Sequence, residues 1–200
     1  MTELYAAGVD PYCYPDSSVL RNKFDIRDAQ LLTDVESLYS QQRLAELYTD
    51  HPVAGRFGLT HLSRIHRFVF QDVYAWAGKL RTVRIHKGQT TFAYPEHIKS
   101  EADRIFSSLR RENHLRDLPL PVLIERLAWY VGELNVLHPF REGNGRVLRA
   151  FLRELLLQQG LLLKFEKLDP EEWLQASIAA YVGDLLKMQA LFARIIEPLK

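Results

Sequence analysis

His138-Pro139-Phe140-Arg141-Glu142-Gly143-Asn144-Gly145-Arg146-Val147-Leu148-Arg149 combines a helix break, a glycine loop and a helix start. Proline disfavours the helical region for the residue before it, so the helix that delivers His138 ends there. Gly143 and Gly145 are free to adopt positive φ, and the loop leads directly into the next helix. Backbone N–H groups and the dipole at such a helix N-terminus form a nest that holds phosphate.

The side chains of this stretch complete a site for phosphate chemistry. Arg146 and Arg149 are three residues apart, so their guanidinium groups share a helix face beside the nest. Beside a polyphosphate, Glu142 is best explained as a ligand of Mg²⁺, which takes one or two carboxylates in such sites. A neutral His138 can accept a proton from an incoming hydroxyl. Each residue alone has an ordinary structural explanation, but together they predict phosphoryl or nucleotidyl transfer.

The rest of the chain predicts an all-α fold around this junction. Leu31, Val35, Leu38 and Tyr39 fall at helical spacing and are expected to form the apolar face of a helix over 29–48. Thr60 is expected to cap a second helix that ends near Gly78. Asp169 is expected to cap a later helix, with Glu172 reaching back to the cap. The other helices are predicted over 96–112, 121–137, 145–159 and on either side of residues 183–184.

One β-hairpin is expected to be the only β-structure. Two β-prone runs, 82–86 and 90–94, flank a loop that contains Gly88. A lone hairpin is marginal in water, so it must pack on helices. We therefore expect one domain, 1–200, with an N-terminal arm (1–28), the hairpin (82–94) and the active-site loop and helix (138–159).

Composition excludes several classes of protein. The chain has 200 residues, 47% of them hydrophobic, and 26 basic against 25 acidic residues give a net charge of +1. No charge block indicates direct binding to nucleic acid or to an anionic membrane. One cysteine favours a reducing compartment. A signal peptide and a membrane-spanning apolar run are both absent from the sequence, so a cytoplasmic protein is expected.

The stretch 138–149 resembles the signature of Fic-domain proteins, HPFx(D/E)GNGRxxR, at every specified position. With average residue usage, chance agreement is on the order of 10⁻¹¹ per start position. The similarity to compact bacterial Fic toxins extends to Asp10-Pro11-Tyr12-Cys13-Tyr14-Pro15, to Trp76-Ala77-Gly78 and to the hairpin. It covers nearly the whole chain.

The resemblance implies a protein adenylyltransferase that moves AMP from ATP onto a Ser, Thr or Tyr hydroxyl and releases pyrophosphate. His138 would be the base, and Glu142 would position Mg²⁺. Gly143, Asn144 and Gly145 would form the anion hole, with Asn144 at the α-phosphate. Arg146 would hold the β-phosphate region and Arg149 the γ-phosphate.

The resemblance also implies partners. The hairpin 82–94, called the flap in this family, would dock the target through strand-like pairing of Thr82, Val83, Arg84, Ile85 and His86. Targets would be the type II topoisomerases, DNA gyrase and topoisomerase IV. A small antitoxin would supply an inhibitory (S/T)xxxE(G/N) helix whose glutamate pairs with Arg149. Residues 108–113 fit that string, but they lie between the flap and the helix leading to His138, where such helices are not expected.

Rival readings of the same residues remain. The enzyme could transfer a different phosphate-linked group, either UMP or the γ-phosphate. The nest could instead hold a nucleotide in a non-catalytic interaction module. The GNG pattern, which Doc-type kinase toxins lack, favours AMP transfer.

Overall fold

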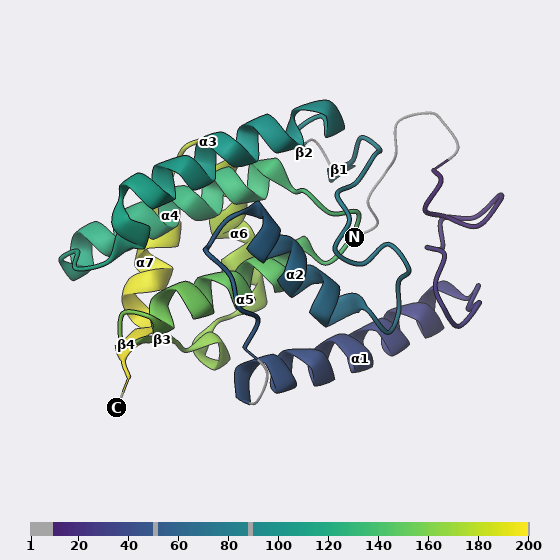
Figure 1. Cartoon of the computed structure of the whole chain (residues 1–200), viewed down its shortest axis with the longest axis horizontal. Coiled ribbons are helices and arrows are strands. Elements are labelled where there is room, and N and C mark those ends of the chain that lie inside the picture. The colour runs from purple at the N-terminus through teal and green to yellow at the C-terminus, as the bar shows by residue number, and fades with distance from the viewer. Residues whose placement is uncertain (1–9, 50–51, 88–89, 200) are drawn as a thin grey trace.

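Figure 1 shows the chain as a computed structural model, which describes residues 10–49, 52–87 and 90–199. Over these residues the fold is mostly helical, as the sequence predicts. Its helices are α1 Ala29–Thr49, α2 Leu59–Phe70, α3 Ile98–Arg111, α4 Leu120–Leu137, α5 Asn144–Leu157, α6 Pro170–Tyr181 and α7 Leu186–Ile195. Its strands are β1 His86–Lys87, β2 Thr90–Thr91, β3 Leu161–Leu163 and β4 Ile196–Pro198.

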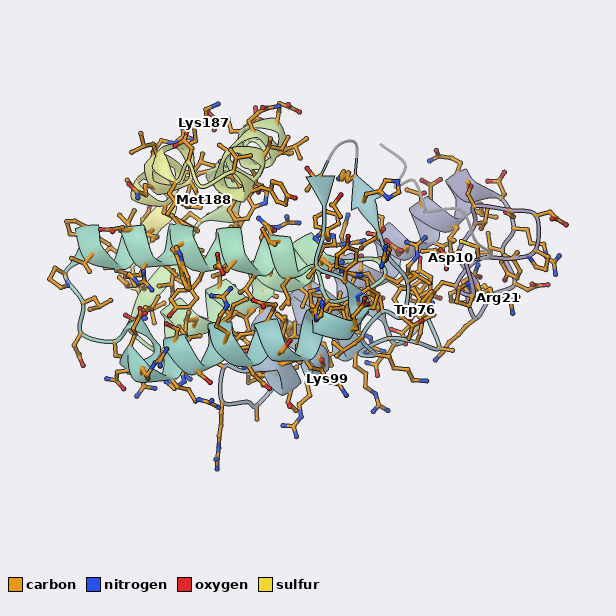
Figure 2. The ribbon with its side chains drawn as sticks, turned by 90° about the horizontal axis from the view of Figure 1, so that it is seen from above. Asp10, Arg21, Trp76, Lys99, Lys187 and Met188 are labelled. Atoms are coloured by element: carbon orange, nitrogen blue, oxygen red, sulfur yellow. The ribbon has the colours of Figure 1, made fainter. Side chains whose placement is uncertain are left out.

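Helix α5 runs through the middle of the molecule and packs against α2 and α4 (Figure 1). The apolar side chains of α5 are buried, and so are most of those of α4. Helices α6 and α7 form a pair that packs on α4, and Figure 2 shows this pair beside the flap strands. The junction between α4 and α5 therefore lies among the main packing elements of the domain.

The strands β3 and β4 form a second antiparallel pair, with Leu162 opposite Glu197. The prediction that the hairpin is the only β-structure was therefore wrong. A run of three leucines carries no period-2 signal, and its partner strand is more than thirty positions away along the chain. Local sequence could not reveal this pairing.

Helix α2 differs at both ends from the prediction. Its N-cap is Gly58 rather than Thr60, and it ends at Phe70 rather than near Gly78. Val73 is buried, but it lies with Trp76 in the turns of 71–78 that follow the helix. Apolar residues recur at helical spacing from the helix into these turns because the turns also pack on the core.

The buried face of α1 is not the predicted apolar stripe. Leu31 and Leu38 are exposed, whereas Leu32, Ser40 and Leu47 are buried. The inward face carries Glu36 and Ser40 because it binds a charged side chain of the active site, described below. Polar residues on an inward face mislead a pattern that scores only hydrophobicity.

The flap is shorter as a strand pair than its predicted span of 82–94. Only His86 pairs with Thr91 and Lys87 with Thr90 in the described residues. Asp169 caps α6 by accepting from the N–H groups of Glu171 and Glu172, as predicted. The Glu172 carboxylate binds Arg194 instead of reaching back. None of the described helices combines the length and hydropathy that crossing a bilayer requires.

Candidate active site

The α4–α5 junction begins with a strained residue. His138 has φ 42° and ψ 63°, which is left-handed, and its N–H closes α4 by donating to the Leu134 carbonyl at 3.1 Å. A non-glycine residue in this conformation costs about 1–3 kcal/mol. The following Pro139 prevents the helix from continuing. Contacts elsewhere must therefore hold the histidine in place.

The loop after Pro139 is fixed by its own residues. Gly143 has φ 81°, and a Cβ there would lie 2.3 Å from the ring of Phe70, so glycine is required. The Asn144 side chain binds the backbone of Phe140 twice: Oδ1 accepts from its N–H at 2.9 Å, and Nδ2 donates to its carbonyl at 2.8 Å. The Asn144 side chain is therefore engaged within the loop, which leaves its backbone N–H as the group that can face an anion.

The N-terminus of α5 presents backbone donors. The first helical hydrogen bond runs from Val147 N–H to the Gly143 carbonyl. The N–H groups of Asn144, Gly145 and Arg146 precede it and have no partner within the part of the chain that the structure describes. The Gly143 N–H donates to the Glu142 carboxylate at 2.8 Å. A negative oxygen already lies against this nest, as expected of an anion site.

Two contacts help to orient the imidazole of His138. Nδ1 lies 3.2 Å from the Asn135 carbonyl and donates to it, so Nε2 carries the lone pair. The ring stacks on Phe92 of the flap, with centroids 3.8 Å apart and planes 19° apart. Burial, and secondarily the nearby positive charges of Arg81 and Lys87, lowers the pKa of His138 to about 3. The ring is neutral at pH 7, as a base must be.

The two arginines of the stretch differ. Arg146 forms an ion pair with Glu36, donates to Ser40 Oγ at 2.9 Å and lies over the Phe70 ring. Arg149 makes no ion pair or hydrogen bond to any described residue, and burial lowers its pKa. Arg149 is therefore a partly buried cation that an incoming anion would stabilise.

Glu142 fits a Mg²⁺ ion that binds with phosphate. Its carboxylate is about a third exposed and lies 3.6 Å from Arg146. No group of three or more His, Cys, Asp or Glu side chains that could hold a metal occurs among the described residues. A single carboxylate suits Mg²⁺, which completes its shell with waters and phosphate oxygens.

One cavity of about 600 Å³ collects these groups. Its polar end is formed by the α4–α5 junction and includes His138, Glu142, Gly143, Asn144, Gly145, Arg146 and Arg149. Its other end is formed mainly by α6 and includes Trp173, Leu174, Ile178 and Tyr181. The structure thus brings together all the nucleotide-site residues predicted from 138–149.

The Fic/DOC family model matches residues 56–156, about half of the chain. The chain is also 40% identical to the probable protein adenylyltransferase y4lH of Sinorhizobium fredii, over 96% of this chain and 98% of that protein. The chain belongs to the Fic/DOC family. It is 41% identical, over 95% of its length, to the protein adenylyltransferase VbhT of Bartonella schoenbuchensis, of which it spans 40%.

Solved Fic structures share the fold. The effector BepC of Bartonella tribocorum with bound AMPPNP has a TM-score of 0.86 and 26% identity, over 94% of this chain and 97% of that one. A Fic domain of Bartonella quintana with bound ADP has a TM-score of 0.88 and 27% identity, over 94% and 95%. This Fic/DOC chain is a nucleotidyltransferase of the protein adenylyltransferase class.

The flap of this Fic/DOC protein is tied to distant elements. The Tyr12 hydroxyl of the arm accepts from the Thr82 N–H at 3.2 Å, and the Tyr181 hydroxyl of α6 donates to the Thr91 carbonyl at 2.9 Å. Of the docking residues expected from sequence, Thr82 and Arg84 are exposed, Val83 and His86 are half-buried, and Ile85 is buried. The Ile85 side chain is therefore part of the core rather than the docking surface.

Arg81 is a residue that sequence reasoning missed. Its side chain is 2% exposed. Its guanidinium donates to backbone carbonyls at both ends of the flap and at the active-site junction. Nε donates to the His138 carbonyl at 2.7 Å and Nη1 to the Val83 carbonyl at 2.8 Å; Nη2 donates to the Ala93 carbonyl. An arginine at the start of a short hairpin carries no sequence signal of such burial.

Two more residues that support the site, His66 and Glu36, were not predicted as site residues from the sequence. His66 is fully buried; its Nε2 donates to the Glu142 carbonyl at 3.0 Å, and its Nδ1 accepts from the Gly78 N–H at 2.8 Å. Burial lowers the pKa of His66 to about 4. Glu36 binds Arg146 and also accepts from the Tyr74 hydroxyl. Only the tertiary structure brings these residues to the loop.

The string at residues 108–113 does not reach the site. The Glu112 carboxylate accepts from Arg126 of α4 at 2.6 and 2.8 Å and from Ser108. The hydrogen bond to Arg126 helps to lower the pKa of Glu112 against the opposing effect of burial. This glutamate is engaged with α4 rather than with Arg149.

Proposed function

We propose that the protein transfers AMP from ATP to a hydroxyl of a target protein and releases pyrophosphate. The observation that carries this is the single cavity in which a neutral His138 faces the donor-rich start of α5. A base and a phosphate cradle in one recess are the two requirements for attack on a phosphorus atom.

The polar end of the cavity suits a triphosphate. The N–H groups of Asn144 and Gly145 point out of the helix start, and Arg146 is already oriented by Glu36. Arg149 supplies the charge that lacks a partner among the described residues. We infer that the α-phosphate binds at the helix start, with Arg146 near the β-phosphate and Arg149 at the γ-phosphate.

The apolar end suits a nucleoside. Trp173 and Tyr181 present aromatic surface, and Leu174 and Ile178 add aliphatic surface, beside the polar loop. A site for inorganic phosphate would need no such wall. The cavity volume of about 600 Å³ is in the usual range for ligands of nucleotide size.

Chemistry then follows from the histidine geometry. Nε2 of His138 accepts the proton of the target hydroxyl, and the hydroxyl oxygen forms a bond to the α-phosphorus. The bond from that phosphorus to the bridging oxygen breaks, and the electron pair leaves with pyrophosphate. Glu142 would hold Mg²⁺, which when bound offsets charge on the phosphate oxygens.

The target would dock on the flap. Thr82 and Arg84 are exposed beside the half-buried His86, and this edge of the flap would receive an added strand. Phe92 of the same flap contacts the His138 ring, which couples the docking edge to the base. The type II topoisomerases, DNA gyrase and topoisomerase IV, are the proposed targets.

Inhibition would come from a separate small antitoxin in a toxin–antitoxin pair. Arg149 has no carboxylate partner in the described ranges 10–49, 52–87 and 90–199, and Glu112 is held by Arg126. A glutamate supplied from another chain would pair with Arg149 and displace the γ-phosphate. If the protein alone shows almost no auto-modification and Glu112→Gly activates it, this regulation is wrong.

ATP labelled at either the α or the γ phosphorus separates the possible reactions. AMP transfer leaves the α label on protein and releases the γ label; retention of the γ label would show kinase activity instead. A UTP control detects UMP transfer. His138→Ala should lower the rate roughly 10²–10⁴-fold while nucleotide binding survives. A variant with an unchanged rate removes His138 from the mechanism, and a wild type without transfer favours a binding module.

A further inference from the structure

A second cavity, of about 590 Å³, lies against α2 and the turns that follow it. It shares no lining residue with the active-site cavity. One wall of this cavity is formed by the turns of 71–78, in which Trp76 is labelled in Figure 2. Five basic side chains line the cavity against one acidic side chain, Asp72; the basic ones are Lys23, Arg43, Arg64, Arg67 and Lys79. The whole chain has 26 basic and 25 acidic residues, so this basic cavity is a local concentration of charge.

The one carboxylate of the basic cavity is already matched. Arg43 binds Asp72 through two parallel hydrogen bonds, of 2.6 and 3.0 Å. The hydrogen bond from Arg43, despite opposing burial, holds the pKa of Asp72 below its usual range. The other four basic side chains therefore face the recess without a compensating acid on its lining.

These four cations are weakly engaged within the protein. Lys23 donates to the Gln71 carbonyl at 2.6 Å and Arg64 to the Ala54 carbonyl at 3.2 Å. The side chains of Arg67 and Lys79 make no ion pair or hydrogen bond in the portion of the chain that the structure describes. Such a site gains electrostatic energy from a partner that brings several negative charges together.

We propose that the basic cavity binds an acidic segment of a protein partner. The volume exceeds what a single inorganic phosphate would fill, and Thr60 and Ser63 add hydroxyl groups that can bind a peptide backbone or carboxylate. Nucleic acid would call for a basic stripe following a backbone, whereas these charges are confined to a recess of a chain with net charge +1.

The location identifies the partner as the modified protein. Lys79 is three positions before Thr82, so the two backbones are at most about 11 Å apart. The cavity wall is also fixed to the active-site loop, because the Gly78 N–H donates to His66 and His66 donates to the Glu142 carbonyl. An acidic segment held here would flank a stretch that docks on the flap. This docking role rests on the proposed function, whereas binding of an acidic segment does not.

Binding can be tested without nucleotide. A fluorescent decaglutamate peptide is titrated at low ionic strength against the wild type, Arg67→Gln/Lys79→Gln, and the control Arg110→Gln/Arg111→Gln, whose arginines are exposed at the end of α3. We expect the dissociation constant to rise about 10-fold in the cavity variant and to stay unchanged in the control, with a weaker salt dependence in the variant. A decaglutamine peptide should not bind.

Three outcomes would overturn the proposal: no binding by the wild type, equal loss in both double variants, or tighter binding of a short DNA duplex that is lost in the cavity variant. The docking role is tested with the acceptor protein identified by mass spectrometry. The KM for this acceptor should rise in the Arg67→Gln/Lys79→Gln variant, while auto-modification stays unchanged. A failure of AMP transfer itself would abolish modification by every variant but would leave the peptide titration intact.

Discussion

The active-site loop, 138–149, and the flap, 82–94, meet where the His138 ring stacks on Phe92, but they are held in different ways. The loop has contacts of its own, because Asn144 binds Phe140 twice, and it is also held by Phe70 and His66 of α2. The flap is braced by Arg81, and from elsewhere in the chain by Tyr12 and Tyr181. Contacts made within a segment can be read from its sequence, whereas contacts supplied by distant elements cannot.

Replacing the glycine at the helix start breaks the loop and carries the largest expected effect. Gly143→Ala puts a Cβ 2.3 Å from the Phe70 ring at a φ of 81°. Backbone strain and overpacking together should lower the free energy of unfolding by about 3 kcal/mol or more. Urea unfolding measures this loss, and ATP titration should show weaker nucleotide binding.

The matched control is Gly183→Ala. Gly183 has φ 90° but no atom within 4 Å of the added Cβ, so only backbone strain of about 1 kcal/mol is expected. Equal losses in the two variants would mean that the contact with Phe70 does not constrain the loop.

Acid should weaken the loop's support through two histidines. His66 and His138 have pKa values lowered by burial to about 4 and about 3, while the unfolded chain protonates both near 6.5. The folded state therefore binds fewer protons, so stability is complete above about pH 6.5 and falls as the pH drops below it. Well below pH 6.5, each histidine should lower the free energy of unfolding by about 1.4 kcal/mol for every pH unit.

Unfolding free energies measured between pH 7 and 5, above most carboxylate titrations, should show this slope. His66→Gln should remove the share of one buried histidine; His114, whose pKa burial also lowers, contributes to the remainder. If the dependence of the unfolding free energy on pH is the same in His66→Gln, the titrating groups lie elsewhere and His66 does not make the loop sensitive to acid.

The contrast between the two regions also explains what sequence reasoning could recover. The apolar stripes of α4 and α5 follow helical periodicity, and Asp169 is a strong cap, so these elements were predicted well. The motif itself fixes the order of helix end, loop and helix start. Its residues meet in one cavity because the two helices pack on the same core.

The failures share one physical cause. The buried face of α1, the burial of Arg81 and the pairing of β3 with β4 all depend on partners far along the chain. Glu36 looks like a surface acid until Arg146 is placed beside it. Periodicity reports hydrophobicity within one element, so it cannot reveal a polar side chain whose reason for burial lies on another element.

Arg81 tests whether the flap depends on support from outside its strands. Arg81→Lys keeps the charge but cannot donate to the carbonyls of His138, Val83 and Ala93 together. We expect kcat/KM for the acceptor protein to fall roughly 10–100-fold, through both kcat and acceptor KM, because about 1–3 kcal/mol of hydrogen bonding is lost. ATP affinity should change less than about twofold.

Arg126→Lys is the control, because Arg126 pairs with Glu112 away from the flap. If Arg81 has a purely structural role, Arg81→Lys should behave like Arg126→Lys: both variants lose melting temperature, and the folded fraction of each keeps normal kinetics. Loss of ATP affinity in Arg81→Lys equal to its loss of acceptor affinity would show that flap and loop form one unit.

The smallest expected effect comes from the tyrosines that hold the flap from either side. Tyr12→Phe removes the acceptor of the Thr82 N–H, and Tyr181→Phe removes the donor to the Thr91 carbonyl. Both bonds are exposed, so each loss should cost about 0.5–1 kcal/mol and raise the acceptor KM about 2–5-fold without changing ATP affinity. Because the tyrosines act on opposite arms of one hairpin, the double variant should depart from additivity. Strictly additive effects in this double-mutant cycle would mean that the two arms of the flap are held independently.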